Sequence, residues 1–248
     1  MDPVTRLIGI PVIVPLCDAR GTMSIPSVVD YLHQAAWQSA VSLGAGVPDL
    51  MERGVSWVLQ RMKLEIQHLP RANSRIDIHS WPSGRDRFFA YRDYRMFAEN
   101  GALLVQATST WVVFDLQTRN MIHIPDWVAL PIDESEIPPS LPRLSGKIRF
   151  PEAVDYSQSF QPNWFDVDIN QHVTNTRFFR WILETLPVDH LRTHTIAEVD
   201  LIFKQELIVG EPLVGQASVN GMDTFIHQLV RKNGSIAAIG STKWREHI

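Results

Sequence analysis

The chain presents the same order of predicted elements twice, and this internal repeat is the feature that most limits its fold. In each half, a polar turn leads into a helix with apolar residues at helical spacing, and four strand-like stretches follow. Asn100-Gly101 in the first half and Asn233-Gly234 in the second are strong signals for hairpin turns. We therefore expect an α+β chain in which each half forms an antiparallel sheet around one central helix.

The first half is expected to start with a strand at residues 12–15, followed by a helix. Pro26 opens this helix, because a proline in the first turn loses no hydrogen bond, and Gly44 and Gly46 end it. Further strands are predicted at residues 57–67, 75–82, 88–99 and 103–115. The buried face of the helix is expected to contain Val28, Val29, Leu32, Ala35, Ala36 and Ser39.

The second half repeats this plan, with a helix predicted at residues 173–186, just before Pro187. Strands are expected to follow at residues 197–208, 212–220, 224–232 and 235–245. One face of the helix is expected to carry Phe178, Trp181, Ile182 and Thr185.

A proline-rich, partly acidic stretch between the halves predicts a linker. We expect an N-terminal domain at residues 1–125, the linker at 126–150 and a C-terminal domain at 151–248. A chain of 248 residues, 45% of them hydrophobic, is long enough for two small cores. Two such sheets side by side would cover each other's edges. The prolines of the stretch are Pro131, Pro138, Pro139 and Pro142.

Residues 166–175, Asp-Val-Asp-Ile-Asn-Gln-His-Val-Thr-Asn, place two acids, an amide and an imidazole directly before the second helix. The N–H groups at a helix start point outward and unpaired, which suits a reaction that builds negative charge on an oxygen. The same residues also suit an Asx turn with helix caps. The spacing alone therefore supports a catalytic site and a structural turn about equally.

These residues, together with the helix that contains Trp181-Ile-Leu-Glu184, resemble the C-terminal half of the acyl-acyl-carrier-protein thioesterases of plants and bacteria. The resemblance covers nearly the whole chain and implies a double (tandem) hotdog fold, with two long antiparallel sheets each wrapped round a central helix and joined into one continuous sheet. The first half resembles the family at Trp57-Val-Leu-Gln-Arg61, Phe89-Ala-Tyr-Arg-Asp93, Ala107-Thr-Ser-Thr-Trp111-Val and Thr118-Arg119.

The resemblance also implies the reaction, which is hydrolysis of an acyl-acyl-carrier-protein thioester to free fatty acid, ending chain elongation without a cofactor. Glu206 matches the family's acid, whereas Leu207 stands where plant members have cysteine, so a Cys–His mechanism is impossible there. We expect Glu206 to activate water, while Asn170 and His172 hold the thioester and water. Asp168 is expected to orient them. Attack by the Glu206 carboxylate itself, forming an anhydride, is the competing mechanism.

The start of the second helix is expected to bind the substrate. Backbone N–H groups of Val173, Thr174 and Asn175 would stabilise the oxyanion. Thr174 replaces the usual asparagine of the family, and Phe178 replaces its tyrosine. Both departures suggest altered packing or specificity and not a loss of catalysis.

Aligning the halves on Asp18 and Asp166, an offset of 148, predicts a single working site. This offset sets Arg20 against Asp168, Thr22 against Asn170 and Ser24 against His172. The first half would then lack the acid, amide and imidazole. We therefore expect it to be a scaffold, with the acyl pocket, for a site in the second half.

The implied partner is acyl carrier protein, a small acidic protein that carries the acyl chain on a phosphopantetheine arm. A chain of net charge −4 would need a local basic patch to bind it. Each of the two candidate clusters is explained equally well as ordinary surface arginines that are solvated or ion-paired. The clusters are Arg85, Arg87, Arg92 and Arg95, and Arg143, Lys147 and Arg149.

Other classes of protein fit less well. The charge argues against a general nucleic-acid surface, the scattered histidines lack metal-ligand spacing, and no phosphate-binding glycine loop appears. One cysteine, no secretory signal and no long apolar run lead us to expect a cytoplasmic protein. The tandem arrangement fits a monomer, whereas the resemblance to plant members also allows a homodimer. An acyl-CoA thioesterase of the same fold and a non-catalytic acyl-binding protein remain the alternatives, ahead of a hotdog dehydratase.

Overall fold

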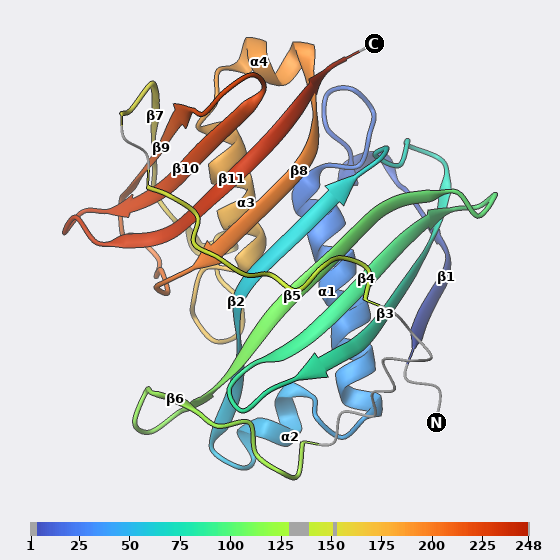
Figure 1. The fold of residues 1–248 in the computed structure, drawn as a ribbon, viewed down its shortest axis with the longest axis vertical. Coiled ribbons are helices and arrows are strands. Elements are labelled where there is room, and N and C mark those ends of the chain that lie inside the picture. The colour runs from blue at the N-terminus through green and yellow to red at the C-terminus, as the bar shows by residue number, and fades with distance from the viewer. Residues whose placement is uncertain (1–3, 129–138, 151–152, 248) are drawn as a thin grey trace. The chain divides into compact units, whose positions relative to one another are not determined.

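The computed structural model describes residues 4–128, 139–150 and 153–247, and the chain divides into two compact units, Met1–Leu144 and Ser145–Ile248 (Figure 1). The division falls inside the stretch predicted as a linker. Part of that stretch, residues 129–138 with Pro131 and Pro138, lies outside the described residues. In each unit, a long helix lies along one face of an antiparallel sheet (Figure 1).

The first unit has its strands in the order β1-β3-β4-β5-β2, and a short strand β6 pairs with β5. The turn between β4 and β5 uses Gly101 at a φ of 80°, as the Asn-Gly pair predicts. The elements are β1 (Thr5–Pro11), η1 (Val14–Leu16), α1 (Ile25–Ser42), α2 (Val47–Met51), β2 (Val55–Ile66), β3 (Arg75–Arg85), β4 (Ala90–Ala98), β5 (Leu103–Asp115) and β6 (Met121–Ile122).

Helix α1 begins where its sequence predicts. Ser24 accepts the N–H of Ser27 through its side chain, and Pro26 occupies the first turn. All six residues predicted for its buried face are buried. They pack in the first unit, whose core also contains fully buried strand residues such as Leu64, Ile78 and Met96. The hydrophobic periodicity of the helix sequence therefore predicted its buried face correctly.

The second unit orders its strands β8-β11-β10-β9-β7. Phe178, Trp181, Ile182 and Thr185 are buried, as predicted for one face of the helix. The elements are β7 (Tyr156–Phe160), η2 (Trp164–Asp166), α3 (Asn175–Glu184), α4 (Val188–Thr193), β8 (His194–Phe203), β9 (Leu213–Val219), β10 (Thr224–Arg231) and β11 (Ile236–Glu246).

Helix α3 approaches strand β9 closely at a glycine. A Cβ atom at Gly215 would overlap Thr185 Oγ1 and lie 2.9 Å from Phe160 Cε2. Thr185 Oγ1 is held in place because its hydroxyl donates to the Trp181 carbonyl oxygen at 2.7 Å. Glycine at position 215 therefore lets the end of the helix lie directly on the sheet.

The structure corrects several predicted boundaries. The strand expected at residues 12–15 is wrong: β1 ends at Pro11, and residues 14–16 form the short 3-10 helix η1. Pro11 and Pro15 have no N–H to donate to a strand ladder. The strand expected at 197–208 runs instead from His194 to Phe203. Helices α2 and α4 were not predicted, because five or six residues are too few to show a period. None of the helices among the described residues is long and apolar enough to cross a membrane.

Candidate functional site

The loop before α3 folds around the Asp168 carboxylate. Asp168 Oδ1 accepts the backbone N–H of Asn170 at 2.8 Å and that of His172 at 3.4 Å. The Asp168 N–H donates to the His172 carbonyl oxygen at 2.8 Å, which closes the loop. Gln171 has a φ of 64°, the left-handed conformation that so tight a turn requires. The carboxylate thus sets the backbone positions of both Asn170 and His172.

Backbone hydrogen bonds fix the two ends of this loop. The Thr174 N–H donates to the Asp166 carbonyl oxygen at 2.9 Å, beside the Val167–Val173 bridge. Asp166 accepts the Asn163 N–H at 2.8 Å and forms an ion pair with Arg177 Nε at 3.0 Å. Its contacts are therefore those of a turn residue that also anchors the first turn of α3.

Glu206 lies in the loop after β8 and reaches the histidine of the first loop. The distance from His172 Nε2 to Glu206 Oε2 is 3.3 Å. The two loops are joined because the Val173 N–H donates to the Leu207 carbonyl oxygen at 2.8 Å, one residue beyond each member of the pair. Both side chains are partly exposed, at 29% for His172 and 42% for Glu206, so water reaches them.

Asn170 completes the cluster, because its side-chain Nδ2 lies 3.4 Å from Asp168 Oδ2. The structure thus brings Asp168, Asn170, His172 and Glu206 together in the second unit. An acid beside an imidazole can pass a proton, and an amide can hold a carbonyl or a water. The arrangement is chemically suited to acid–base hydrolysis.

The substrate-binding residues predicted at the helix start need a correction. The N–H groups of Val173 and Thr174 donate to Leu207 and Asp166, so neither is free to stabilise an oxyanion. The Thr174 hydroxyl lies 2.9 Å from that of Thr176. Among the described residues, no acceptor is recorded for the Asn175 N–H, which begins α3. Of the three backbone N–H groups predicted to stabilise an oxyanion, only that of Asn175 therefore keeps this expected role.

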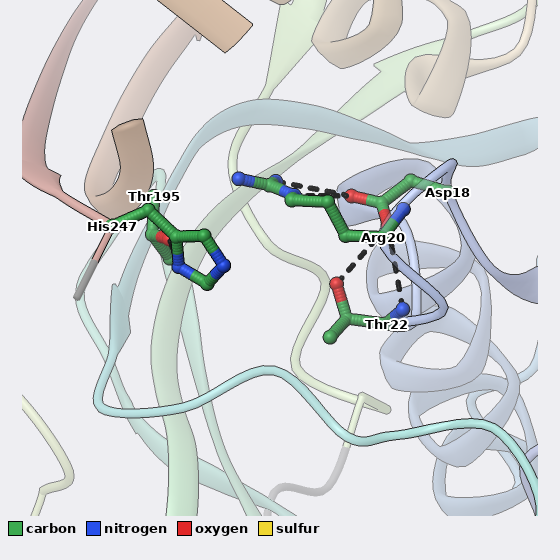
Figure 2. A network of polar contacts seen from close by, with 5 residues as sticks. All are labelled: Asp18, Arg20, Thr22, Thr195 and His247. Atoms are coloured by element: carbon green, nitrogen blue, oxygen red, sulfur yellow. Dashed lines mark hydrogen bonds and ion pairs between the residues drawn. The ribbon is translucent and has the colours of Figure 1, made fainter. Parts of the chain in front are cut away.

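The first unit contains the same loop with different side chains (Figure 2). The Asp18 N–H donates to the Thr22 carbonyl oxygen at 2.8 Å, and Asp18 Oδ1 accepts the N–H groups of Arg20 at 2.9 Å and Thr22 at 3.3 Å. Gly21 adopts a φ of 72°. Every one of these contacts has its counterpart 150 residues later, around Asp168.

The predicted repeat offset of 148 is therefore wrong, and the correct offset at this loop is 150. Asp18 corresponds to Asp168 and not to Asp166, so the first unit keeps the acid that we expected it to lack. Arg20 replaces the amide and Thr22 replaces the imidazole. Helix N-terminal signals, Ser24 in α1 and Thr174 in α3, would have given this offset from the sequence.

The first unit also lacks the second acid. The Met23 N–H donates to the Pro70 carbonyl oxygen at 2.7 Å, just as Val173 donates to Leu207, which sets Leu69 against Glu206. Leu69 is buried. In addition, the Arg20 guanidinium donates to Asp18 Oδ2 at 3.0 Å, so the acid is neutralised within its own loop. The first-unit loop thus keeps the backbone of the site without its reactive groups.

Two arginines of the basic clusters predicted to bind the carrier protein, Arg92 and Arg143, have structural contacts instead. Arg92 is buried and donates to Ser80 Oγ at 3.1 Å, and burial lowers the pKa of its guanidinium. It is therefore no part of a surface patch. Arg143 donates to Ser83 Oγ at 3.0 Å and lies over the Tyr91 ring at 4.5 Å. These arginines have structural contacts inside the first unit.

Comparison with known families decides the relationship. A model of the acyl-ACP thioesterase N-terminal domain matches residues 10–132, and a model of the acyl-ACP thioesterase C-terminal domain matches residues 151–246. The chain belongs to the acyl-ACP thioesterase family. The resemblance inferred from the sequence motifs is thus confirmed.

Individual acyl-ACP thioesterases show the same relationship. The chain is 28% identical over 251 residues to the chloroplastic palmitoyl-acyl carrier protein thioesterase of Cuphea hookeriana, covering 92% of this chain and 59% of that protein. It is 27% identical to the chloroplastic dodecanoyl-[acyl-carrier-protein] hydrolase of Cinnamomum camphora, covering 90% and 63%. The chain thus spans about three-fifths of the length of these relatives.

Solved structures of acyl-ACP thioesterases share the fold. The 12:0-ACP thioesterase of Umbellularia californica has a TM-score of 0.88 at 22% identity, covering 100% of this chain and 99% of that chain. An acyl-ACP thioesterase of Bacteroides thetaiotaomicron has a TM-score of 0.81 at 19% identity, covering 98% and 97%. These similarities confirm the predicted tandem hotdog fold class.

Proposed function

We propose that this chain hydrolyses the thioester of acyl-acyl carrier protein and releases free fatty acid, which ends chain elongation. The names of its relatives support this substrate and reaction. The observation that carries the proposal is the contact of 3.3 Å between His172 Nε2 and Glu206 Oε2, next to Asn170 in one loop cluster. This cluster offers a base and hydrogen-bond donors without any bound cofactor.

In the proposed mechanism, Glu206 accepts a proton from water as the water oxygen attacks the thioester carbon. Asn170 and His172 hold the carbonyl and the water, and Asp168 keeps their loop in position. The Asn175 N–H stabilises the negative charge that develops on the oxygen. The carbon–sulfur bond then breaks, and the proton passes to the leaving thiolate, giving a free acid and a thiol.

The competing mechanism has the Glu206 carboxylate attack first and form an anhydride that water then opens. A single turnover in water labelled with oxygen-18 detects an anhydride that water opens at the Glu206 carbonyl. Attack by water leaves the label in the fatty acid alone. An anhydride that water opens at the protein carbonyl places the label in Glu206, where mass spectrometry of the digested protein detects it.

We further propose that the two units have different roles. The second unit supplies the catalytic residues, since only its loop cluster contains both the imidazole and the second acid. The first unit acts as a scaffold and provides the acyl pocket from α1 and its sheet. The predicted cytoplasmic location stays a prediction, because the plant relatives are named as chloroplastic, and monomer or homodimer stays open as well.

The test is release of free thiol by the purified protein from matched acyl-carrier-protein and acyl-CoA thioesters of increasing chain length. Faster turnover of the carrier-protein thioester supports the proposal. Equal or faster turnover of the CoA thioester supports an acyl-CoA thioesterase of the same fold. Tight binding of either thioester without turnover supports a non-catalytic acyl-binding protein and contradicts the catalytic roles.

A further inference from the structure

Large apolar side chains are exposed around the catalytic loops of the second unit. Phe165 is 86% exposed, Ile169 is 83% exposed and Trp164 is 66% exposed. Ile208 and Val209, in the loop that follows Glu206, are also exposed. We call these five residues the apolar rim. Exposed apolar surface that is gathered in one place commonly marks an interaction site.

The apolar rim lies on the same backbone segments as the catalytic residues. The Asp166 carbonyl oxygen accepts the Thr174 N–H, which ties η2 to the catalytic loop. The Gly210 N–H donates to the Pro162 carbonyl oxygen at 2.9 Å, which ties the loop after Glu206 to the segment before Trp164. A partner seated on the rim would therefore lie beside the His172–Glu206 pair.

The matching loops of the first unit provide an internal comparison. Their backbone contacts are the same, since the Asn73 N–H donates to the Val12 carbonyl oxygen at 2.7 Å in place of the Gly210–Pro162 bond. Their side chains differ: the positions equivalent to Phe165, Ile169, Ile208 and Val209 hold Pro15, Ala19, Arg71 and Ala72. The loop architecture therefore forms without large apolar residues at these positions.

Lys204 offers one contact for an acidic partner, beside two exposed acids of the site, Asp168 and Glu206. Lys204, two residues before Glu206, is exposed, and among the described residues no carboxylate pairs with it. Its ammonium lies 5.7 Å from the centre of the Phe150 ring. The equivalent position in the first unit holds the uncharged Gln67. An exposed cation beside an apolar surface suits an acidic protein with apolar residues on its contact face.

We propose that the apolar rim is the docking surface for the acidic carrier protein that delivers the thioester. This inference rests on the proposed function, because it needs a protein-borne substrate. A carrier that presents its thioester on an arm must seat within that arm's reach of the reacting groups, and the rim lies on the same loops as those groups. Burial of Phe165 and Ile169 by the carrier removes apolar surface from water and stabilises the complex.

The test compares two substrates with the same acyl chain, one on carrier protein and one on free pantetheine. The variant Phe165→Ser/Ile169→Ser is expected to lose at least tenfold more kcat/KM on the carrier-protein substrate than on the pantetheine substrate, mainly through KM. Val14→Ser is the matched control, since Val14 is the first-unit equivalent of Trp164 and is 64% exposed. It is expected to show no such selective loss.

The affinity of unacylated holo carrier protein, measured by calorimetry, checks docking independently of turnover and is expected to fall at least tenfold in the double variant. Equal losses on both substrates, or an unchanged affinity, would overturn the docking role. A wild-type dimer that the double variant converts to monomer in sedimentation, with unchanged substrate preference, would assign the rim to a second copy instead. If the wild type turns over pantetheine or CoA thioesters but no carrier-protein substrate, the proposed function fails, and the docking role with it.

Discussion

Replacing Asp168 with alanine tests whether its carboxylate positions the proposed catalytic residues or only stabilises their loop. Asp168→Ala removes the hydrogen bond from the Asn170 N–H at 2.8 Å and two longer contacts at 3.4 Å. A hydrogen bond to a charged group contributes about 1.5–3 kcal/mol. Asp168 is exposed, so water replaces much of what is lost, and we expect the free energy of unfolding to fall by only about 1 kcal/mol.

Activity is expected to fall much further than stability in this variant. Asn170 and His172 both take their backbone positions from the Asp168 carboxylate, and a displacement of about 1 Å from productive geometry costs about 100-fold in rate. The first-unit twin provides the control. Asp18→Ala removes an equivalent set of contacts, together with the ion pair to Arg20 at 3.0 Å, from a loop without reactive groups.

For both alanine variants, the free energy of unfolding is measured in urea, and kcat/KM is measured with acyl-acyl carrier protein as the substrate. We expect Asp18→Ala to be destabilised by at least as much as Asp168→Ala while keeping activity within about threefold of the wild type, since its loop takes no part in the proposed chemistry. If Asp168→Ala loses no more activity than Asp18→Ala, the carboxylate does not position the catalytic residues and the reasoning is refuted.

Three further predictions address packing, pH and charge. Gly215→Ala should destabilise the second unit by about 1–3 kcal/mol in urea unfolding, because its Cβ would overlap Thr185 Oγ1; no change would mean that the helix end shifts freely. Burial lowers the pKa of His227 from 6.5 to about 3. Between these two pH values the unfolded chain binds a proton at His227 and the folded chain does not, so the free energy of unfolding should fall as the pH drops from 6.5 towards 3. His227→Gln should flatten this loss between pH 6.5 and pH 5 in urea unfolding, and an unchanged slope would contradict it. Lys204→Glu should raise KM for acyl carrier protein more than Lys232→Glu, an exposed hairpin lysine; equal effects in steady-state assays would contradict a local contact.

Local signals in the sequence predicted much of the fold. The buried faces of α1 and α3 followed from helical spacing, and the turns at Gly101 and Gly234 followed from Asn-Gly pairs. Both kinds of signal depend on neighbours a few residues apart. By contrast, η1 interrupts an apolar stretch that looked like a strand, because Pro15 has no backbone donor.

The site was harder to predict, because its contacts link residues that are distant in the sequence. The repeat offset was misjudged by two residues because matching one aspartate to another ignored the start of each helix. The sequence suggested that the N–H of Val173 was free to bind an oxyanion, whereas in the structure it donates to the Leu207 carbonyl oxygen, 34 residues later. The proximity of His172 and Glu206 was expected from family resemblance, and no spacing rule would have supplied it.

The most direct test of the proposed chemistry is the single-turnover rate at which the Glu206→Gln variant releases fatty acid from acyl-acyl carrier protein. Glu184→Gln is the matched control, since Glu184 is an exposed acid of the same unit that pairs with Arg180 at 2.8 Å. The proposed role of Glu206 predicts at least a 100-fold loss in Glu206→Gln, with carrier-protein affinity retained, and near-normal release in Glu184→Gln. Near-normal release by Glu206→Gln would contradict the assignment of Glu206 as the group that activates water.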